Sequence, residues 1–321
     1  MIDLCPKIRY TFPHMTIFES LVLGLVEGLT EYLPVSSTGH LIITQYLLNL
    51  PDSDAMKAFE ICIQGGAILA ILGLYFSRVR LMLKGLWHAV QTVLRRPHEA
   101  DTEARNGLSM LINTVVGFLP AAVIGLLCNK IIKAYLFNAP TVCITWAVGG
   151  IVILLYARAR EKSGKGFAGK PLEELTWKGA LAVGFMQCIA MIPGTSRSLM
   201  TMLGGLCVGL SVAAAVEFSF LLGLITLGAA TAHDAMKYGA SMVSDIGWGP
   251  MIAGTLMAWA SAVVAVKWMV GYLNKHSLSL FGWYRLAAAV VMLGFIFNGL
   301  SVSEEQEPAE PAAATAPAEQ Q

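Results

Sequence analysis

The sequence has few charged residues for its length. Of its 321 residues only 13% are charged, whereas 56% are hydrophobic, and the formal net charge is +1. A soluble domain normally carries about 25% charged residues, so this chain has too few to cover a water-exposed surface. The small net charge and the lack of a basic stripe with interleaved aromatic residues also argue against a nucleic-acid partner. The composition therefore predicts an integral membrane protein.

Paired cysteines and a cleavable leader are also lacking. The six cysteines form no CxxC motif and mostly lie in apolar stretches, where a thiol acts as a small hydrophobic group. We therefore expect reduced packing residues. Residues 1–16 contain no apolar core followed by a small-residue cleavage site, so no removable signal peptide is expected. Residues 301–321, rich in Glu, Ala, Pro and Gln, are expected to form a disordered acidic tail.

Two apolar segments are interrupted near their middle. Residues 17–50 are broken by Pro34 and a Ser-Ser-Thr-Gly run, and residues 179–210 are broken by a Pro-Gly-Thr-Ser run that begins at Pro193. A membrane-spanning helix needs about 20 apolar residues, and each half falls short of that. Backbone that is not helical at membrane depth must be buried in protein or line a wet cavity. We therefore expect each segment to form a re-entrant pair of short helices beside a pocket.

Six further apolar segments are candidates for membrane-spanning helices. They lie at residues 59–76, 108–127, 141–156, 214–232, 251–273 and 280–300. An amphipathic interfacial helix is expected over residues 81–94. The predicted fold is an all-α polytopic membrane protein, with about six transmembrane helices plus two re-entrant helix pairs, in a single domain over residues 1–300.

The order of these segments occurs twice: a broken pair, a span that opens with an acidic residue, and two more spans. This order predicts an internal duplication, with repeat one at residues 17–156 and repeat two at residues 179–300. The two strongly basic loops, residues 77–107 and 158–178, are expected on the cytoplasmic side. The two repeats would then enter the membrane from opposite sides, as in an inverted-topology repeat.

Glu27 and Glu31 lie in the first broken segment, about one helical turn apart on one face. Two buried carboxylates this close cannot both stay ionised cheaply. A divalent cation, Mg²⁺ or Ca²⁺, could bridge them, because such ions take oxygen ligands and Mg²⁺ often adds substrate phosphate oxygens. The alternative is a protonated, hydrogen-bonded pair that joins helices. We favour metal binding or acid–base work.

Hydroxyl groups follow each interruption, where a helix should begin. The first turn of a helix has free N–H groups and a positive dipole end, so each helix start suits an anion. Arg197 would lie in such a first turn, and a guanidinium can bind phosphate bidentately. The expected phosphate-binding residues are Ser36, Thr38, Gly194, Thr195, Ser196, Arg197 and Ser198.

His40 lies three residues after Ser37, on the same face of the expected helix, where it could act as a base for that hydroxyl. A lone histidine in an apolar helix is usually a satisfied core residue, but the neighbouring polar groups favour a functional role. The predicted catalytic residues are Glu31, Ser37, His40 and Arg197. Weaker candidates, for which structural and functional roles are balanced, are Glu60, Gln64, Gln187 and Glu217.

The motifs in and around the interruptions resemble those of the undecaprenyl-diphosphate phosphatase family, bacterial membrane enzymes associated with bacitracin resistance. The resemblance covers about residues 17–300. Its motifs are EGLTEYLPVSSTGH at Glu27–His40, FEICIQGGAI at Phe59–Ile68, PGTSRS at Pro193–Ser198 and EFSFLL at Glu217–Leu222. One departure follows the last motif, where the family usually has a proline and this chain has Gly223-Leu224-Ile225.

The resemblance implies hydrolysis of undecaprenyl diphosphate, a C55 polyprenyl diphosphate lipid, to undecaprenyl phosphate and inorganic phosphate. This reaction recycles the lipid carrier for peptidoglycan synthesis and confers bacitracin resistance. The resemblance also implies divalent-cation dependence and a bacterial inner-membrane location with the site facing the periplasm. By motif it assigns function to Glu27, Glu31, Ser37, His40 and Arg197.

A transporter or flippase for a polyprenyl phosphate is the alternative, because broken helices in inverted repeats are typical of secondary transporters. A transporter needs neither a nucleophile nor phosphate release, so the Ser37/His40 pairing favours the enzyme. The attacking group stays open among Ser37, His40 and a water molecule. The glycine- and alanine-rich spans would allow close helix packing and therefore a homodimer.

Overall fold

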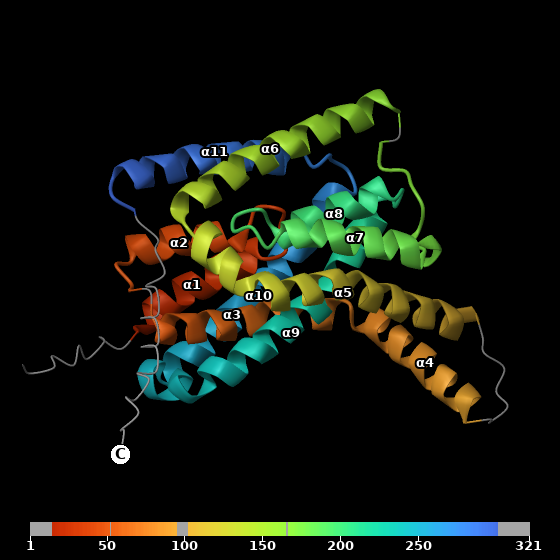
Figure 1. The fold of residues 1–321 in the computed structure, drawn as a ribbon, viewed down its shortest axis with the longest axis horizontal. Helices are drawn as coiled ribbons and strands as arrows, with labels where there is room; N and C mark the ends of the chain where they lie inside the picture. Colours follow the sequence, from red (N-terminus) through yellow and green to blue (C-terminus); the bar gives the residue numbers. More distant parts are fainter. Residues whose placement is uncertain (1–14, 52, 95–101, 165, 301–321) are drawn as a thin grey trace, which may run out of the picture.

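The computed structural model describes residues 15–51, 53–94, 102–164 and 166–300, and in these ranges the chain is built from helices (Figure 1). The expected acidic tail, residues 301–321, lies outside the described residues. The helices are α1 (Ile17–Thr30), α2 (Ser37–Leu47), α3 (Asp54–Leu74), α4 (Phe76–Val93), α5 (Thr102–Leu136), α6 (Ala139–Lys162), the 3-10 helix η1 (Leu172–Glu174), α7 (Trp177–Ile189), α8 (Arg197–Cys207), α9 (Val212–Ile246), α10 (Trp248–Leu273) and α11 (Ser279–Phe297).

Six of the described helices, α3, α5, α6, α9, α10 and α11, are long and apolar enough to cross a membrane, which confirms a multi-pass membrane protein. Two are longer than expected. Both α5 and α9 have 35 residues, so they run well beyond the expected spans at residues 108–127 and 214–232. Polar residues alone do not end a helix: α5 runs to Leu136, and Asn138 then caps the start of α6.

Each interrupted segment forms two short helices joined by a non-helical link. Break one, residues 31–36, joins α1 to α2, and break two, residues 190–196, joins α7 to α8. Both links end on a serine with positive φ: Ser36 has φ 71° and ψ 107°, and Ser196 has φ 78° and ψ 114°. The short pairs agree with the expected re-entrant segments, whereas the division into two repeats stays a prediction.

Glycines let several helices approach at backbone distance. A Cβ on Gly24 of α1 would lie 2.2 Å from the carbonyl oxygen of Gly254 in α10, and one on Gly150 of α6 would lie 2.8 Å from that of Gly282 in α11. Helix α8 lies at the centre of the fold, where every residue from Ser198 to Leu206 is buried. The small residues expected to favour association therefore pack, in these cases, inside the chain.

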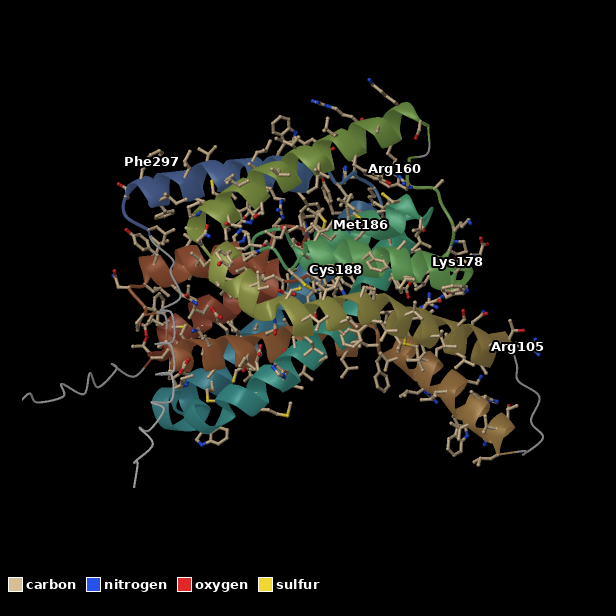
Figure 2. All side chains as sticks on the ribbon, in the orientation of Figure 1. Arg105, Arg160, Lys178, Met186, Cys188 and Phe297 are labelled. Carbon is tan, nitrogen blue, oxygen red and sulfur yellow. The ribbon has the colours of Figure 1, made fainter. Side chains whose placement is uncertain are left out.

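Residues from the two basic segments lie at one end of the molecule. Figure 2 shows Arg105, Arg160 and Lys178 toward the right-hand end of the view, whereas Phe297 lies at the opposite end. This arrangement agrees with the expectation that both basic loops face the same side of the membrane.

Candidate active site

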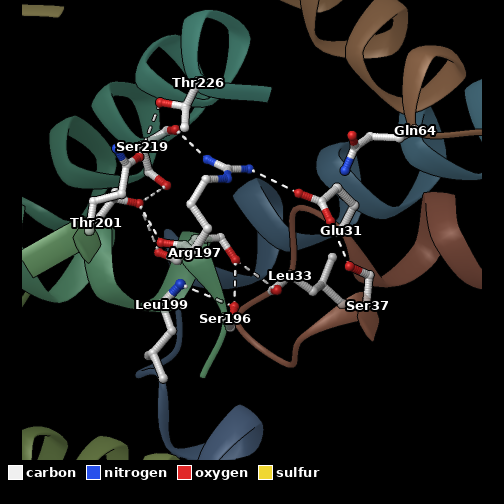
Figure 3. Close-up of polar contacts among 12 residues, drawn as sticks. Glu31, Leu33, Ser37, Gln64, Ser196, Arg197, Leu199, Thr201, Ser219 and Thr226 are labelled. Carbon is white, nitrogen blue, oxygen red and sulfur yellow. Dashed lines mark hydrogen bonds and ion pairs between the residues drawn. The ribbon is translucent and has the colours of Figure 1, made fainter. Parts of the chain in front are cut away.

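The two breaks touch each other, although they lie far apart in the sequence (Figure 3). Ser198 Oγ, just after break two, donates to the carbonyl oxygen of Leu33 in break one at 2.9 Å. Arg197 Nη2 lies 3.4 Å from Glu31 Oε1. The contact brings the predicted residues of both motifs into one site.

Glu31 lies between a hydroxyl and a guanidinium. Ser37 Oγ donates to Glu31 Oε2 at 2.6 Å, while Arg197 approaches the other carboxylate oxygen. The side chains of Glu31 and Arg197 are only 8% and 10% exposed, so water screens their interaction little. A serine hydroxyl, a carboxylate and a guanidinium are thus held in one chain of contacts.

Arg197 is also anchored by groups that the sequence analysis missed. Its Nη1 donates to the carbonyl oxygen of Ser219 in α9 at 3.1 Å, and its guanidinium carbon lies 5.5 Å from the centre of the Tyr32 ring, within cation–π range. A Cβ on Gly223 would lie 2.4 Å from Nη1. Gly223, the first residue after the EFSFLL motif, therefore leaves room for the guanidinium.

His40 does not contact the Ser37 hydroxyl in this structure. Its Nδ1 lies 2.7 Å from the carbonyl oxygen of Ser36, and its Nε2 lies 2.7 Å from the hydroxyl of Tyr284 in α11. A carbonyl oxygen can only accept, so this network assigns the ring proton to Nδ1 and makes Tyr284 the donor to Nε2. The expected Ser37–His40 pair is replaced by Ser37–Glu31, and a catalytic role for His40 stays a prediction.

The serines of the two helix starts differ in their contacts. Ser196 Oγ accepts from the N–H of Leu199 at 3.3 Å and lies 3.0 Å from Ser198 Oγ, so both hydroxyls have structural partners. The Ser36 side chain makes no capping hydrogen bond to α2. The N–H groups in the first turn of α2 are therefore less satisfied by the protein than those of α8.

The remaining predicted phosphate-site residues are less uniform. Thr38 is partly buried in the first turn of α2. Gly194, with φ 83°, and Thr195 are buried in break two, where the Thr195 N–H donates to the carbonyl oxygen of Ile192 at 3.1 Å. Their backbone shapes the link, and Thr38 is the more accessible hydroxyl.

Glu27 is the other carboxylate expected to bind a metal, and it is 2% exposed. Within the described ranges its side chain has no hydrogen-bond or ion-pair partner, and those ranges hold no group of three His, Cys, Asp or Glu residues suited to a metal. Mg²⁺ commonly uses only one or two carboxylates together with substrate phosphate oxygens. The donor chemistry of Glu27 and Glu31 therefore fits a hard divalent cation that arrives with a phosphate.

The weaker candidates all have partners on other elements, which suits a structural role for each. Two of the candidates contribute a carboxylate and two contribute the oxygen of a glutamine amide. The pairs are Glu60 with Gln45, Glu217 with Arg78, Gln64 with Thr231 and Gln187 with Thr226.

The chain is similar to known proteins over most of its length. Residues 20–291 match the family model described as bacitracin resistance protein BacA. Undecaprenyl-diphosphatase 1 of Chromobacterium violaceum is 42% identical over 284 residues, which cover 88% of this chain and 98% of the relative. Undecaprenyl-diphosphatase 2 of Rhodospirillum rubrum is 40% identical over 88% of this chain and 96% of its own length. The chain therefore belongs to the family of bacitracin resistance protein BacA.

Proposed function

We infer that the protein hydrolyses undecaprenyl diphosphate to undecaprenyl phosphate and inorganic phosphate. The observation that carries this inference is the contact chain Ser37–Glu31–Arg197, formed across the two breaks. It combines a hydroxyl, a carboxylate and a phosphate-binding guanidinium in a chain whose relatives are named undecaprenyl-diphosphatases. The reaction recycles a lipid carrier of cell-wall synthesis, and it fits the bacitracin resistance in the family's name.

Arg197 and the start of α2 hold the terminal phosphate in this proposal. The guanidinium has an Nε without a partner among the described residues, and its contact with Glu31 is long, so a phosphate can compete for it. The first turn of α2 lacks a Ser36 cap and so offers N–H donors. Transfer of a phosphoryl group depends mainly on positioning and charge stabilisation, which these groups supply.

Ser37 is the attacking group that the geometry favours. Its Oγ attacks the terminal phosphorus, the bond from that phosphorus to the bridging oxygen breaks, and undecaprenyl phosphate leaves. The Ser37 proton passes to Glu31 Oε2, 2.6 Å away. One water molecule then cleaves the phosphoserine and releases inorganic phosphate. Attack by His40 or directly by water are the alternatives, and rapid-quench trapping separates them: phosphoserine, phosphohistidine or no covalent species.

A divalent cation, Mg²⁺ or Ca²⁺, belongs to this proposal. Glu27 and Glu31 would hold it, and when bound it would offset the negative charge of the diphosphate. The burial of Glu27, at 2% exposed, keeps this carboxylate away from bulk water. We further propose that the protein resides in the bacterial inner membrane with this site open to the periplasm, and that two copies form a homodimer.

The test measures phosphate release from undecaprenyl diphosphate by the purified, detergent-solubilised protein, with and without EDTA. Arg197→Ala and His40→Ala are measured beside the native protein. Metal-dependent release that Arg197→Ala abolishes is the expected result, and His40→Ala shows how much the imidazole contributes. Binding without release by well-folded native protein would overturn the enzyme and favour a carrier.

A further inference from the structure

Arg285, in α11, forms hydrogen bonds with both breaks. Its Nη2 donates to the carbonyl oxygens of Gly194 in break two, at 2.8 Å, and of Thr145 in α6, at 2.9 Å. Its Nη1 donates to the carbonyl oxygen of Pro34 in break one, at 3.3 Å. One guanidinium thus satisfies backbone carbonyls from both non-helical links and from a spanning helix. The carbonyls of Pro34 and Gly194 lie in non-helical links, where no helix supplies them with a donor.

The charge of Arg285 is buried without a carboxylate. The residue is 0% exposed, and the ion pairs of the described ranges include none with Arg285. A buried cation in an apolar helix is costly, so carbonyl oxygens alone are a minimal compensation. Helix α6 is shaped around the group, because a Cβ on Gly149 would lie 2.5 Å from Arg285 Nη2. A purely apolar contact at this position would need neither the charge nor the space.

We propose that Arg285 is a positioning residue, which holds break one and break two at a fixed separation so that Ser37 and Arg197 act on the same phosphoryl group. Ser37 follows break one and Arg197 follows break two, so their separation depends on how the two links sit against each other. This inference rests on the proposed function. Arg285 itself touches backbone, and acts through the residues that it places.

A lysine cannot replace this fork. The guanidinium is planar and presents donors on two terminal nitrogens, whereas an ammonium is a compact point charge at the end of a flexible stem. Arg285→Lys therefore keeps the charge and loses the simultaneous contact with both links. Because a displacement of about 1 Å between reacting groups can cost about 100-fold in rate, we expect kcat to fall about 100-fold. KM should change less than about threefold, because each link keeps its own phosphate-binding groups.

The matched control is Arg160→Lys. Arg160 also donates to backbone carbonyls of a loop, those of Gly166 and Ala168, but none of its contacts reaches a break. We expect kcat and KM of this variant to stay within about twofold of the native values. If Arg285→Lys behaves like Arg160→Lys, the proposal is overturned.

A second test displaces the guanidinium without removing it, and includes a matched control. Gly149→Ala places a methyl group against Arg285, whereas Gly294→Ala, in α11, adds one where no atom lies within 4 Å. Alanine favours helix over glycine, so neither change should impair folding through helix propensity. A kcat about tenfold lower for Gly149→Ala alone is expected. Equal kcat for the two variants would contradict the proposal.

Hydrogen exchange tests the placement independently of the reaction. In Arg285→Lys, the amides of residues 31–36 and of residues 190–196 should both exchange faster, while α3 and α10 keep native protection. Loosening of only one link would overturn the idea that one residue holds both. If native protein releases no phosphate, the proposed function fails, but this exchange result still decides whether Arg285 holds the breaks together.

Discussion

Break one and break two each end on a serine with the same backbone conformation, but they lead into helices of different chemistry. Ser36 and Ser196 have φ and ψ values within 7° of each other, and each precedes an 11-residue helix. Helix α8 is buried from Ser198 to Leu206, whereas the buried residues of α2 are Gly39, Leu41 and Ile42. Helix α8, which follows break two, therefore belongs to the core, and break one leads to a more accessible helix.

The difference extends to the residues that follow each serine. Break one is followed by Ser37, whose hydroxyl bonds Glu31, and its Ser36 makes no cap. Break two is followed by Arg197, and its Ser196 caps α8. Break one thus presents a serine hydroxyl beside uncapped N–H groups, and break two presents an anchored cation on a helix that is capped by Ser196. The comparison suggests that reaction occurs at break one and that break two binds.

Ser37→Ala should produce the largest loss. If Ser37 is the nucleophile at break one, its removal should lower kcat at least about 10⁴-fold. Steady-state phosphate release by the purified variant measures this. The matched variant at break two, Ser196→Ala, should keep kcat within about threefold, because Ser196 has structural partners. A loss below about tenfold in Ser37→Ala would instead favour attack by water that Ser37 only orients.

Arg197→Lys should come next. A point charge cannot reproduce the planar fork between Glu31, Ser219 and a phosphate, so kcat/KM should fall about 10³-fold. Arg160→Lys, remote from the breaks, serves as the control. Near-native turnover of Arg197→Lys would exclude bidentate phosphate binding by Arg197.

Glu27→Gln should have an intermediate effect and concerns the α1 side of break one. Glu27 lies ten residues before Ser37, and Gln187 of α7 lies ten residues before Arg197. The substitution therefore gives the α1 side the amide that is found at the corresponding position of α7. We expect the divalent-cation concentration for half-maximal activity to rise at least about tenfold. Titration of Mg²⁺ and Ca²⁺ into the EDTA-treated variant tests this. An unchanged metal dependence would exclude Glu27 as a ligand.

The smallest effect should be on stability. Ser196→Ala removes the hydroxyl that accepts from Leu199 and should cost about 1 kcal/mol of unfolding free energy. Ser36→Ala removes no capping bond and should change it by less than about 0.5 kcal/mol. Thermal unfolding in the same detergent compares the two. Equal losses would mean that the caps of the two breaks do not differ in solution.

Both breaks, and the residues Glu31, Ser37 and Arg197 that meet there, could be predicted from the sequence. Prolines and hydroxyls inside apolar runs mark non-helical backbone, and the types of Glu31, Ser37 and Arg197 indicate phosphate chemistry. The pairing within the site was not predictable. His40 was expected to contact Ser37, three residues away, but its Nε2 bonds Tyr284, 244 residues away, and spacing on one helix cannot reveal such a contact.

Two other features depend on side-chain direction and packing. Gly223 matters because the Arg197 guanidinium lies over it, which no local pattern indicates. Arg285 is a single charge in an apolar helix, and its partners are backbone carbonyls of three other segments. The lengths of α5 and α9 were underestimated because the expected spans were confined to the apolar segments at residues 108–127 and 214–232. Residues defined by long-range contacts to backbone leave little trace in composition or spacing.

The two positive-φ serines also have a meaning for protein engineering. A non-glycine residue held in such a sparsely populated conformation costs about 1–3 kcal/mol, and glycine would pay little of that strain. The conformation of each serine therefore lowers the stability of the native state by a small amount. At Ser196 the capping hydrogen bond offsets part of this cost, whereas the Ser36 side chain makes no capping hydrogen bond. A designer seeking a more heat-resistant variant would start with Ser36→Gly. Any activity that this variant loses would measure how much the strained conformation contributes to catalysis.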